Sequence, residues 1–200
     1  AVCMAWETLL MPGCALLAVG GYGRSELYPY SDVDVLILLP QAPDSQQSGA
    51  IEAFVALLWD VGLEIGHSVR TLEECLRESG ADITVETSLL EARYLAGDKK
   101  LAKALAHALG EQRKPTAFWD AKLAEQRKRH MRFHETAYNL EPNIKESPGG
   151  LRDLQTVLWL AHVIGVGHSW KALARRGVIE TTEAARIERD ERLLRELRVR

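Results

Sequence analysis

Two aspartates stand two residues apart at the start of an apolar run, in the segment AVGGYGRSELYPYSDVDVLILL (residues 18–39). Because side chains two apart on a strand point to the same side, Asp32 and Asp34 are expected to project together. At a separation of about 4 Å and an effective dielectric of about 20, two carboxylates repel by roughly 4 kcal/mol, which a bound cation offsets. Few oxygen ligands, with room left for phosphates, suit Mg²⁺. The pair predicts a magnesium site for phosphoryl-type chemistry.

A glycine-rich turn precedes the aspartates. Gly20 and Gly21 carry no side chain, so the backbone N–H groups of this turn can approach a triphosphate closely. Arg24, in the same turn, can add a bidentate contact to a phosphate. Ser31, directly before the first aspartate, is a further candidate for nucleotide binding. Phosphate seat, metal ligands and a neutralising cation are the parts that a phosphoryl-type transfer needs.

Other interpretations of this stretch fit less well. A dinucleotide-binding fingerprint needs a third glycine where Glu26 stands, and its helix is interrupted by Pro29. A P-loop needs Gly-Lys-Ser/Thr, which does not follow the glycines. A purely structural interpretation makes Asp32 a loop residue, Asp34 a water-facing strand residue and the glycines ordinary turns. The combination of glycines, arginine and paired acids favours the transfer site.

The elements expected to position this site form an α/β unit. Strands are predicted over residues 15–19, 32–39 and 63–70. A helix is predicted between the second and third strands, because apolar residues recur there at helical spacing: Ile51, Phe54, Val55, Leu58 and Val61. In the third strand, the polar face carries Glu64, Ser68 and Arg70. Thr71 and Glu74 form a capping box that begins the next helix.

From about Thr84 onward the pattern predicts helices only. Ser88 and Glu91 would cap the segment LLEARYLAG, and further helices are expected from Pro115 to about Tyr138 and over residues 151–163. In the turn ESPGGLRDLQ, the helix start flanked by Lys145 and Arg152 is a candidate anion site, with a plain helix-entry turn as the alternative.

A family resemblance rests on these residues. Gly-Gly, a gap of ten residues and Asp-x-Asp in an apolar strand resemble the polymerase-β-like nucleotidyltransferase superfamily. The segments VGGYGRSELYPYSDVDVLIL, LEIGHSVRTLEEC, DITVETSLLEARYLAGD and LEPNIKESPGGLRDLQTVLWL resemble the amino-terminal part of the bacterial PII uridylyltransferase/uridylyl-removing enzymes. The resemblance implies an α/β (α+β) fold, in which a nucleotidyltransferase domain with a small mixed sheet (residues 1–85) precedes a helical substrate-binding domain (residues 86–200).

The resemblance also implies an activity. Enzymes of this family use Mg²⁺ to transfer UMP from UTP to a tyrosine of the PII nitrogen-regulatory protein, and they release pyrophosphate. Gly20 and Gly21 would correspond to the family's glycine pair, and Asp32 and Asp34 to its metal-binding aspartates. Ser25, Tyr28 and Tyr30 depart from the family pattern at loop positions, where tuning rather than loss of activity is expected.

The superfamily also uses a third carboxylate on a neighbouring strand to activate the attacking hydroxyl. Glu64, on the polar face of the next strand, is the first candidate, and Asp82, at the head of DITV, is the second. Two other functions stay open. The domain could modify a different acceptor, or it could bind a nucleotide as a regulatory module without turnover.

The composition limits the partners and the cellular compartment that are expected for this protein. A net charge of −3 does not indicate a nucleic-acid partner. The cysteines Cys3, Cys14 and Cys75 form no C-x-x-C pair, which argues against a disulfide framework or structural zinc and favours a reduced cytoplasmic setting. No apolar run reaches the roughly 20 residues of a membrane helix, and no signal peptide is expected. The chain is expected to be a fragment, without the His-Asp hydrolase domain of the family, because none of its six histidines precedes an aspartate.

Overall fold

The computed structural model describes residues 2–8, 11–29, 31–133 and 143–199. The chain forms two compact units, Ala1–Gln112 and Arg113–Arg200. In the described residues, no helix is both long enough and apolar enough to cross a bilayer.

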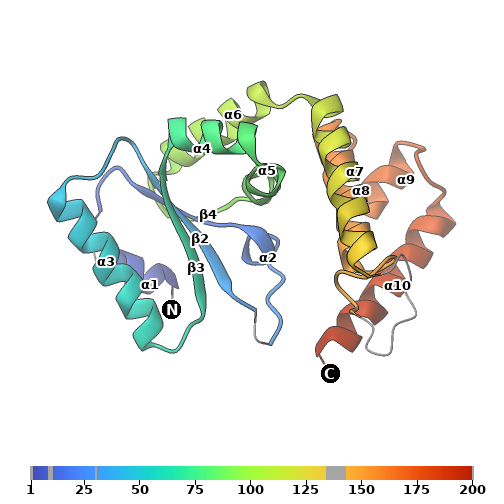
Figure 1. The fold of residues 1–200 in the computed structure, drawn as a ribbon, viewed down its shortest axis with the longest axis horizontal. Coiled ribbons are helices and arrows are strands. Elements are labelled where there is room, and N and C mark those ends of the chain that lie inside the picture. Colours follow the sequence, from blue (N-terminus) through green and yellow to red (C-terminus); the bar gives the residue numbers. More distant parts are fainter. Residues whose placement is uncertain (1, 9–10, 30, 134–142, 200) are drawn as a thin grey trace. The chain divides into compact units, whose positions relative to one another are not determined.

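The first unit is built on a mixed sheet of four strands in the order β3-β2-β1-β4 (Figure 1). β1 (Ala15–Ala18) pairs antiparallel with both β2 (Val33–Leu39) and β4 (Arg93–Gly97), and β2 pairs parallel with β3 (Ile65–Thr71). The first three strands were predicted from the sequence, with ends that differ by one or two residues. The small mixed sheet confirms the predicted fold class.

Helices cover both faces of this sheet (Figure 1). α1 (Val2–Thr8) and α3 (Ser45–Asp60) pack on the face that carries Val33 and Val35, as predicted for those two valines. α4 (Leu72–Ala81), α5 (Ile83–Leu90) and α6 (Lys99–Gln112) pack on the opposite face, which carries Leu36 and Leu38. β2 is therefore apolar on both sides beyond Asp34, and only its beginning is polar on the second face.

One predicted helical segment is a strand. Ser88 and Glu91 lie at the end of α5 instead of capping a new helix, and the residues that follow them form β4. Local periodicity could not reveal this, because β4 is held by hydrogen bonds to β1, which lies far away in the sequence. The predicted domain boundary after residue 85 falls inside α5. The first unit extends to Gln112 because β4 completes the sheet and α6 covers it.

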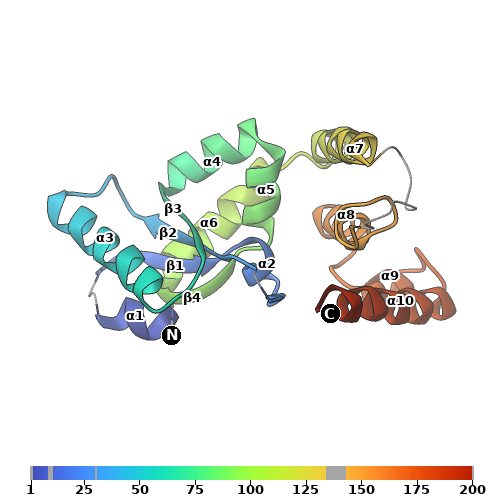
Figure 2. The ribbon, with the colours of Figure 1, turned by 60° about the horizontal axis from the view of Figure 1, so that its bottom comes forward.

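The second unit is helical in its described residues. It contains α7 (Pro115–Arg132), α8 (Leu151–Val163), α9 (Trp170–Arg175) and α10 (Thr181–Val199). α8 lies between α7 on one side and the pair α9 and α10 on the other (Figure 2). The predicted continuation of α7 toward Tyr138 lies outside the described residues.

Candidate functional site

The glycine pair lies in α2 (Gly20–Gly23), a single helical turn between β1 and the loop that leads to β2. Gly20 has a φ of +55°, a left-handed conformation that favours glycine. A Cβ on Gly20 would lie 2.9 Å from Oδ2 of Asp34, and a Cβ on Gly21 would lie 3.2 Å from the carbonyl oxygen of Glu26. The turn therefore packs against the carboxylate of Asp34. This contact explains why position 20 is a glycine, which the sequence alone did not reveal.

Asp34 is half-buried and lies on the face of β2 that also carries Leu36 and Leu38. Its partner in the parallel register is Gly66 of β3, where a Cβ would lie only 2.3 Å from Oδ1 of Asp34. Two glycines from different elements thus leave the space that this carboxylate occupies. Asp32 precedes β2 and is exposed to solvent.

A cleft of about 320 Å³ opens beside Asp34 on the face of the sheet that α5 covers. The polar residues of its lining are Asp34 from β2, His67, Ser68 and Arg70 from β3, and Thr84 and Ser88 from α5. The volume is at the lower end of the range typical of small-molecule sites. The polar face predicted for the third strand therefore borders the cleft, except for Glu64, which is not part of the lining.

Glu64 lies directly before β3 and is exposed. Its carbonyl oxygen accepts a hydrogen bond of 2.8 Å from the backbone N–H of Val33, so the parallel pairing brings it beside the residue that follows Asp32. Across the described parts of the chain, no three acidic, histidine or cysteine side chains gather into a group that could hold a metal ion. The geometry brings Glu64 near the beginning of β2 without completing a three-residue metal site.

Asp82 has a different role in the structure. It is the N-cap of α5, and its Oδ1 accepts hydrogen bonds from the backbone N–H of Thr84 at 2.7 Å and from Oγ1 of Thr84 at 2.6 Å. These hydrogen bonds lower the pKa of the Asp82 carboxyl. The carboxylate is used for capping, and the cap fixes Thr84 at the cleft.

Arg24 was predicted to contact phosphates, but its guanidinium is occupied within the first unit. Nε donates to Oε2 of Glu26 at 2.9 Å and Nη1 donates to Oε1 of Glu91 at 2.5 Å. Burial by itself lowers the pKa of Arg24, but the two carboxylates outweigh burial and the pKa is raised. Arg24 therefore ties the turn that follows α2 to the segment between α5 and β4.

Arg93 was not predicted, because it lies in the segment that was expected to be helical. Its Nε and Nη2 donate to the carbonyl oxygens of Gly23 and Tyr22 at 3.1 and 2.8 Å, and its guanidinium lies 5.3 Å from the centre of the Tyr22 ring. A Cβ on Gly23 would lie 2.3 Å from the carbonyl oxygen of Glu91. β4 and the residues before it thus hold the glycine turn in place.

Ser31 closes the loop between α2 and β2. Its Oγ accepts a hydrogen bond of 3.2 Å from the N–H of Tyr28, and its own N–H donates to the carbonyl oxygen of Tyr28 at 3.0 Å. These contacts give Ser31 a structural role in the loop. Tyr30 lies outside the described residues.

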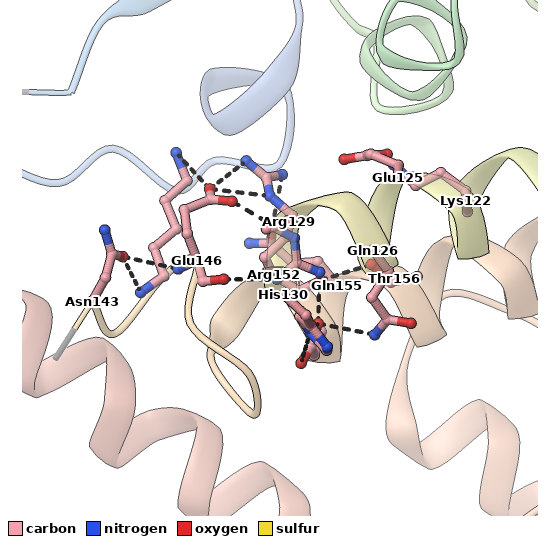
Figure 3. Close-up of polar contacts among 12 residues, drawn as sticks. Lys122, Glu125, Gln126, Arg129, His130, Asn143, Glu146, Arg152, Gln155 and Thr156 are labelled. Carbon is pink, nitrogen blue, oxygen red and sulfur yellow. Dashed lines mark hydrogen bonds and ion pairs between the residues drawn. The ribbon is translucent and has the colours of Figure 1, made fainter. Parts of the chain in front are cut away.

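The prediction of an anion site at the start of α8 is wrong. The N–H groups of Leu151 and Arg152 donate to the carbonyl oxygens of Ile144 and Lys145, both at 2.9 Å. The guanidinium of Arg152 lies against Glu146, at 3.3 Å (Figure 3). These donors are already used, so the segment is the helix-entry turn that was the alternative.

Comparison with known proteins shows the family to which this chain belongs. A family model described as a nucleotidyltransferase domain matches residues 9–147. The chain belongs to the nucleotidyltransferase domain family. A second family model, described as GlnD PII-uridylyltransferase, matches residues 117–200 of this nucleotidyltransferase. The prediction of a nucleotidyltransferase is thus confirmed at the level of the family.

Two curated relatives carry the name bifunctional uridylyltransferase/uridylyl-removing enzyme. The one from Cupriavidus pinatubonensis is 54% identical over 201 residues, which covers 100% of this chain and 23% of the relative. The one from Bordetella parapertussis is 55% identical over 190 residues, which covers 95% of this chain and 22% of the relative. The nucleotidyltransferase chain therefore spans less than a quarter of the length of these relatives.

One solved structure, titled "Crystal structure of the toxin-antitoxin with AMP-PNP", also matches the nucleotidyltransferase chain. It aligns with a TM-score of 0.36 and 15% identity, over 63% of this chain and 93% of that one. At this level the similarity does not establish a common fold.

Proposed function

We propose that this nucleotidyltransferase transfers UMP from UTP to a tyrosine hydroxyl of a PII-type signalling protein and releases pyrophosphate. The observation that carries the proposal is the carboxylate of Asp34, which lies between Gly20 and Gly66 in the lining of the cleft. The relatives named as uridylyltransferases, at 54% and 55% identity, support UTP as the donor and a PII-type protein as the acceptor.

The residues at the beginning of β2 fit a divalent cation. Their donors are carboxylate oxygens, which hard cations prefer, and Gly20 and Gly66 leave room beside Asp34 that any larger residue would fill. We propose that Asp32 and Asp34 hold Mg²⁺. When bound, the ion would neutralise the charge that develops on the transferring phosphoryl group.

The remaining steps belong to residues of this chain. Gly20 and Gly21 seat the triphosphate of the nucleotide, and Ser31 holds the loop that leads to the metal ligands. The tyrosine oxygen forms a bond to the α-phosphorus while the bond from that phosphorus to the pyrophosphate oxygen breaks. The proton of the hydroxyl passes to the carboxylate of Glu64, whose backbone is hydrogen-bonded to that of Val33, the residue after Asp32.

The test is a transfer assay with the purified chain, Mg²⁺, a PII-type protein and each of the four nucleoside triphosphates labelled at the α-phosphate. The proposal expects label on the PII-type protein from UTP alone, one pyrophosphate released per UMP transferred, and no label when the acceptor tyrosine is changed to phenylalanine. Label on another acceptor would show a different member of the superfamily. Binding of UTP without release of pyrophosphate would show a regulatory module and would overturn the proposal.

Gly66→Ala is expected to reduce transfer by about 10²-fold, the loss typical of a catalytic group displaced by about 1 Å. The added Cβ would lie 2.3 Å from Oδ1 of Asp34, so the carboxylate must rotate away. Since only the end of a side chain moves, the urea midpoint should change little. Gly49→Ala in α3 is the matched control, because its Cβ would meet nothing within 4 Å. Full activity of Gly66→Ala would contradict the position assigned to Asp34.

Asp82→Ala is expected to lower the free energy of unfolding by about 1 kcal/mol, because α5 loses its N-cap. Asp82→Ser should recover most of this stability, since a serine hydroxyl also caps a helix. Both variants should keep UMP transfer, whereas Glu64→Gln should lose it. Loss of transfer in the stable Asp82→Ser variant would make Asp82, not Glu64, the third carboxylate.

A further inference from the structure

The cleft beside Asp34 contains one arginine, Arg70 of β3. The parallel register pairs Arg70 with Leu38, whose side chain packs on the face that α4 and α5 cover, so the guanidinium lies on the same face as the carboxylate of Asp34. Arg70 stands four residues beyond Gly66, which is about 13 Å along the strand. The cleft thus has an anionic end at Asp34 and a cationic end at Arg70.

Arg70 differs from the arginine that was predicted to bind phosphate. Arg24 is held by two carboxylates, whereas in the described part of the chain no hydrogen bond or ion pair occupies the guanidinium of Arg70. Glu74, a carboxylate that interacts electrostatically with Arg70, already accepts hydrogen bonds from the N–H and Oγ1 of Thr71 at 2.8 and 3.1 Å. The pKa of Glu74 is lowered mainly by those hydrogen bonds, and Arg70 contributes least.

Residues with hydroxyl groups also line the cleft. Ser68 lies between Gly66 and Arg70 on the same face of β3, and Thr84 and Ser88 face it from α5. Thr84 donates its hydroxyl proton to Oδ1 of Asp82, so it lines the cleft without a proton for a phosphate oxygen. Hydroxyls and a guanidinium are the groups with which proteins hold phosphate oxygens, and a guanidinium can do so with two parallel hydrogen bonds.

We infer that Arg70, together with the hydroxyls of Ser68 and Ser88, binds the β- and γ-phosphates of the nucleoside triphosphate and the pyrophosphate that leaves. The inference rests on the proposed function, because it assumes that the α-phosphate lies at Asp32 and Asp34. It assigns the phosphate-binding cation to β3 and leaves Arg24 a structural role in the glycine turn. Arg70 is then a substrate-binding residue that distinguishes a triphosphate from a monophosphate.

The test measures binding without any acceptor protein. Dissociation constants of UTP, UDP, UMP and uridine are determined in Mg²⁺ for the unchanged chain and for Arg70→Gln, Arg70→Lys and Arg77→Gln. Arg77 is the matched control, because it lies on α4 outside the cleft and pairs with Glu78 at the surface. Circular dichroism and the urea midpoint check that each variant is folded.

Arg70→Gln is expected to weaken UTP binding about 10- to 100-fold, the range for losing a hydrogen bond to a charged group. UMP and uridine should bind within about 3-fold of the unchanged chain. Arg70→Lys keeps the charge but not the two parallel hydrogen bonds, so its affinity for UTP should lie between those of the unchanged chain and Arg70→Gln. This variant also tests the inference if Arg70→Gln does not fold. Arg77→Gln should leave every ligand unaffected.

Three results would overturn the inference. Equal weakening of UTP, UMP and uridine would place Arg70 at the nucleoside, unchanged UTP binding would remove it from the site, and equal loss in Arg77→Gln would show a general effect of charge. Failure of the proposed function can be distinguished from failure of this inference. In that case no UMP reaches a PII-type protein, while UTP binding still depends on Arg70.

Discussion

Asp34→Asn is expected to reduce UMP transfer at least about 10³-fold, which corresponds to roughly 4 kcal/mol of transition-state stabilisation. The amide keeps the size of the carboxylate but removes the negative charge from the position between Gly20 and Gly66. Because the shape is kept, the variant should fold as the unchanged chain does. The measurement is the initial rate of label transfer from UTP over a range of Mg²⁺ concentrations.

Asp60→Asn provides the matched control. Asp60 is an exposed residue at the end of α3 and does not line the cleft, so the same chemical change there should leave transfer unchanged. Asp32→Asn should also lose activity, since the proposed site needs both carboxylates. An active Asp34→Asn variant would remove Asp34 from the metal site. Loss of activity that more Mg²⁺ restores would point to weaker metal binding as the cause.

The part of this site that lies within one strand could be predicted from the sequence. The apolar run that contains Asp34 indicates the strand, which the structure begins at Val33, one residue after Asp32, because alternation along a strand is a local property. The capping box of Thr71 and Glu74 is local in the same way, and the structure contains it. Such features need no knowledge of which elements pair.

Features that depend on pairing could not be predicted. Gly66 faces Asp34 only because β2 and β3 pair in one particular parallel register, and β4 is a strand only because β1 accepts it as a neighbour. Arg24 looks free in the sequence, yet Glu91 reaches it from 67 residues away. The periodicity of a sequence does not indicate which distant residues will be partners. Once the sheet is known, the candidate phosphate-binding arginine therefore changes from Arg24 to Arg70.

A second large effect is expected in the helical unit, at Asp153 in the first turn of α8. Its carboxylate accepts hydrogen bonds from Nε2 of Gln126 (2.9 Å), Nη2 of Arg129 (2.6 Å), Nε2 of His130 (3.0 Å) and the N–H of Gly149 (2.8 Å). One carboxylate thus joins α7, the helix-entry turn and α8. Burial raises the pKa of Asp153, but these donors outweigh burial and the pKa is lowered.

Asp153→Ala is expected to lower the free energy of unfolding by about 3–5 kcal/mol, the range for removing one partner of a buried ion pair. The reason is Arg129, whose side chain is only 4% exposed and whose Nε already has no hydrogen-bond partner among the described residues. Without Asp153, this guanidinium keeps its hydrogen bond to the carbonyl oxygen of Glu146 but loses its closest carboxylate. Urea unfolding, followed by circular dichroism, measures the change.

Asp190→Ala on α10 is the matched control, because Asp190 pairs with Arg186 and Arg189 where its side chain is 57% exposed. Surface pairs of this kind contribute about 0–1 kcal/mol.

The pH dependence separates the charge of Asp153 from its packing. A carboxyl whose pKa is lowered by folding stabilises the protein above its unfolded pKa of about 3.9, and this contribution is lost as the pH falls through the folded value. The difference in stability between the unchanged chain and Asp153→Ala should therefore be full at neutral pH and shrink below about pH 4. A difference that stays constant through this range would mean that packing, and not the ion pair with Arg129, joins α7 to α8.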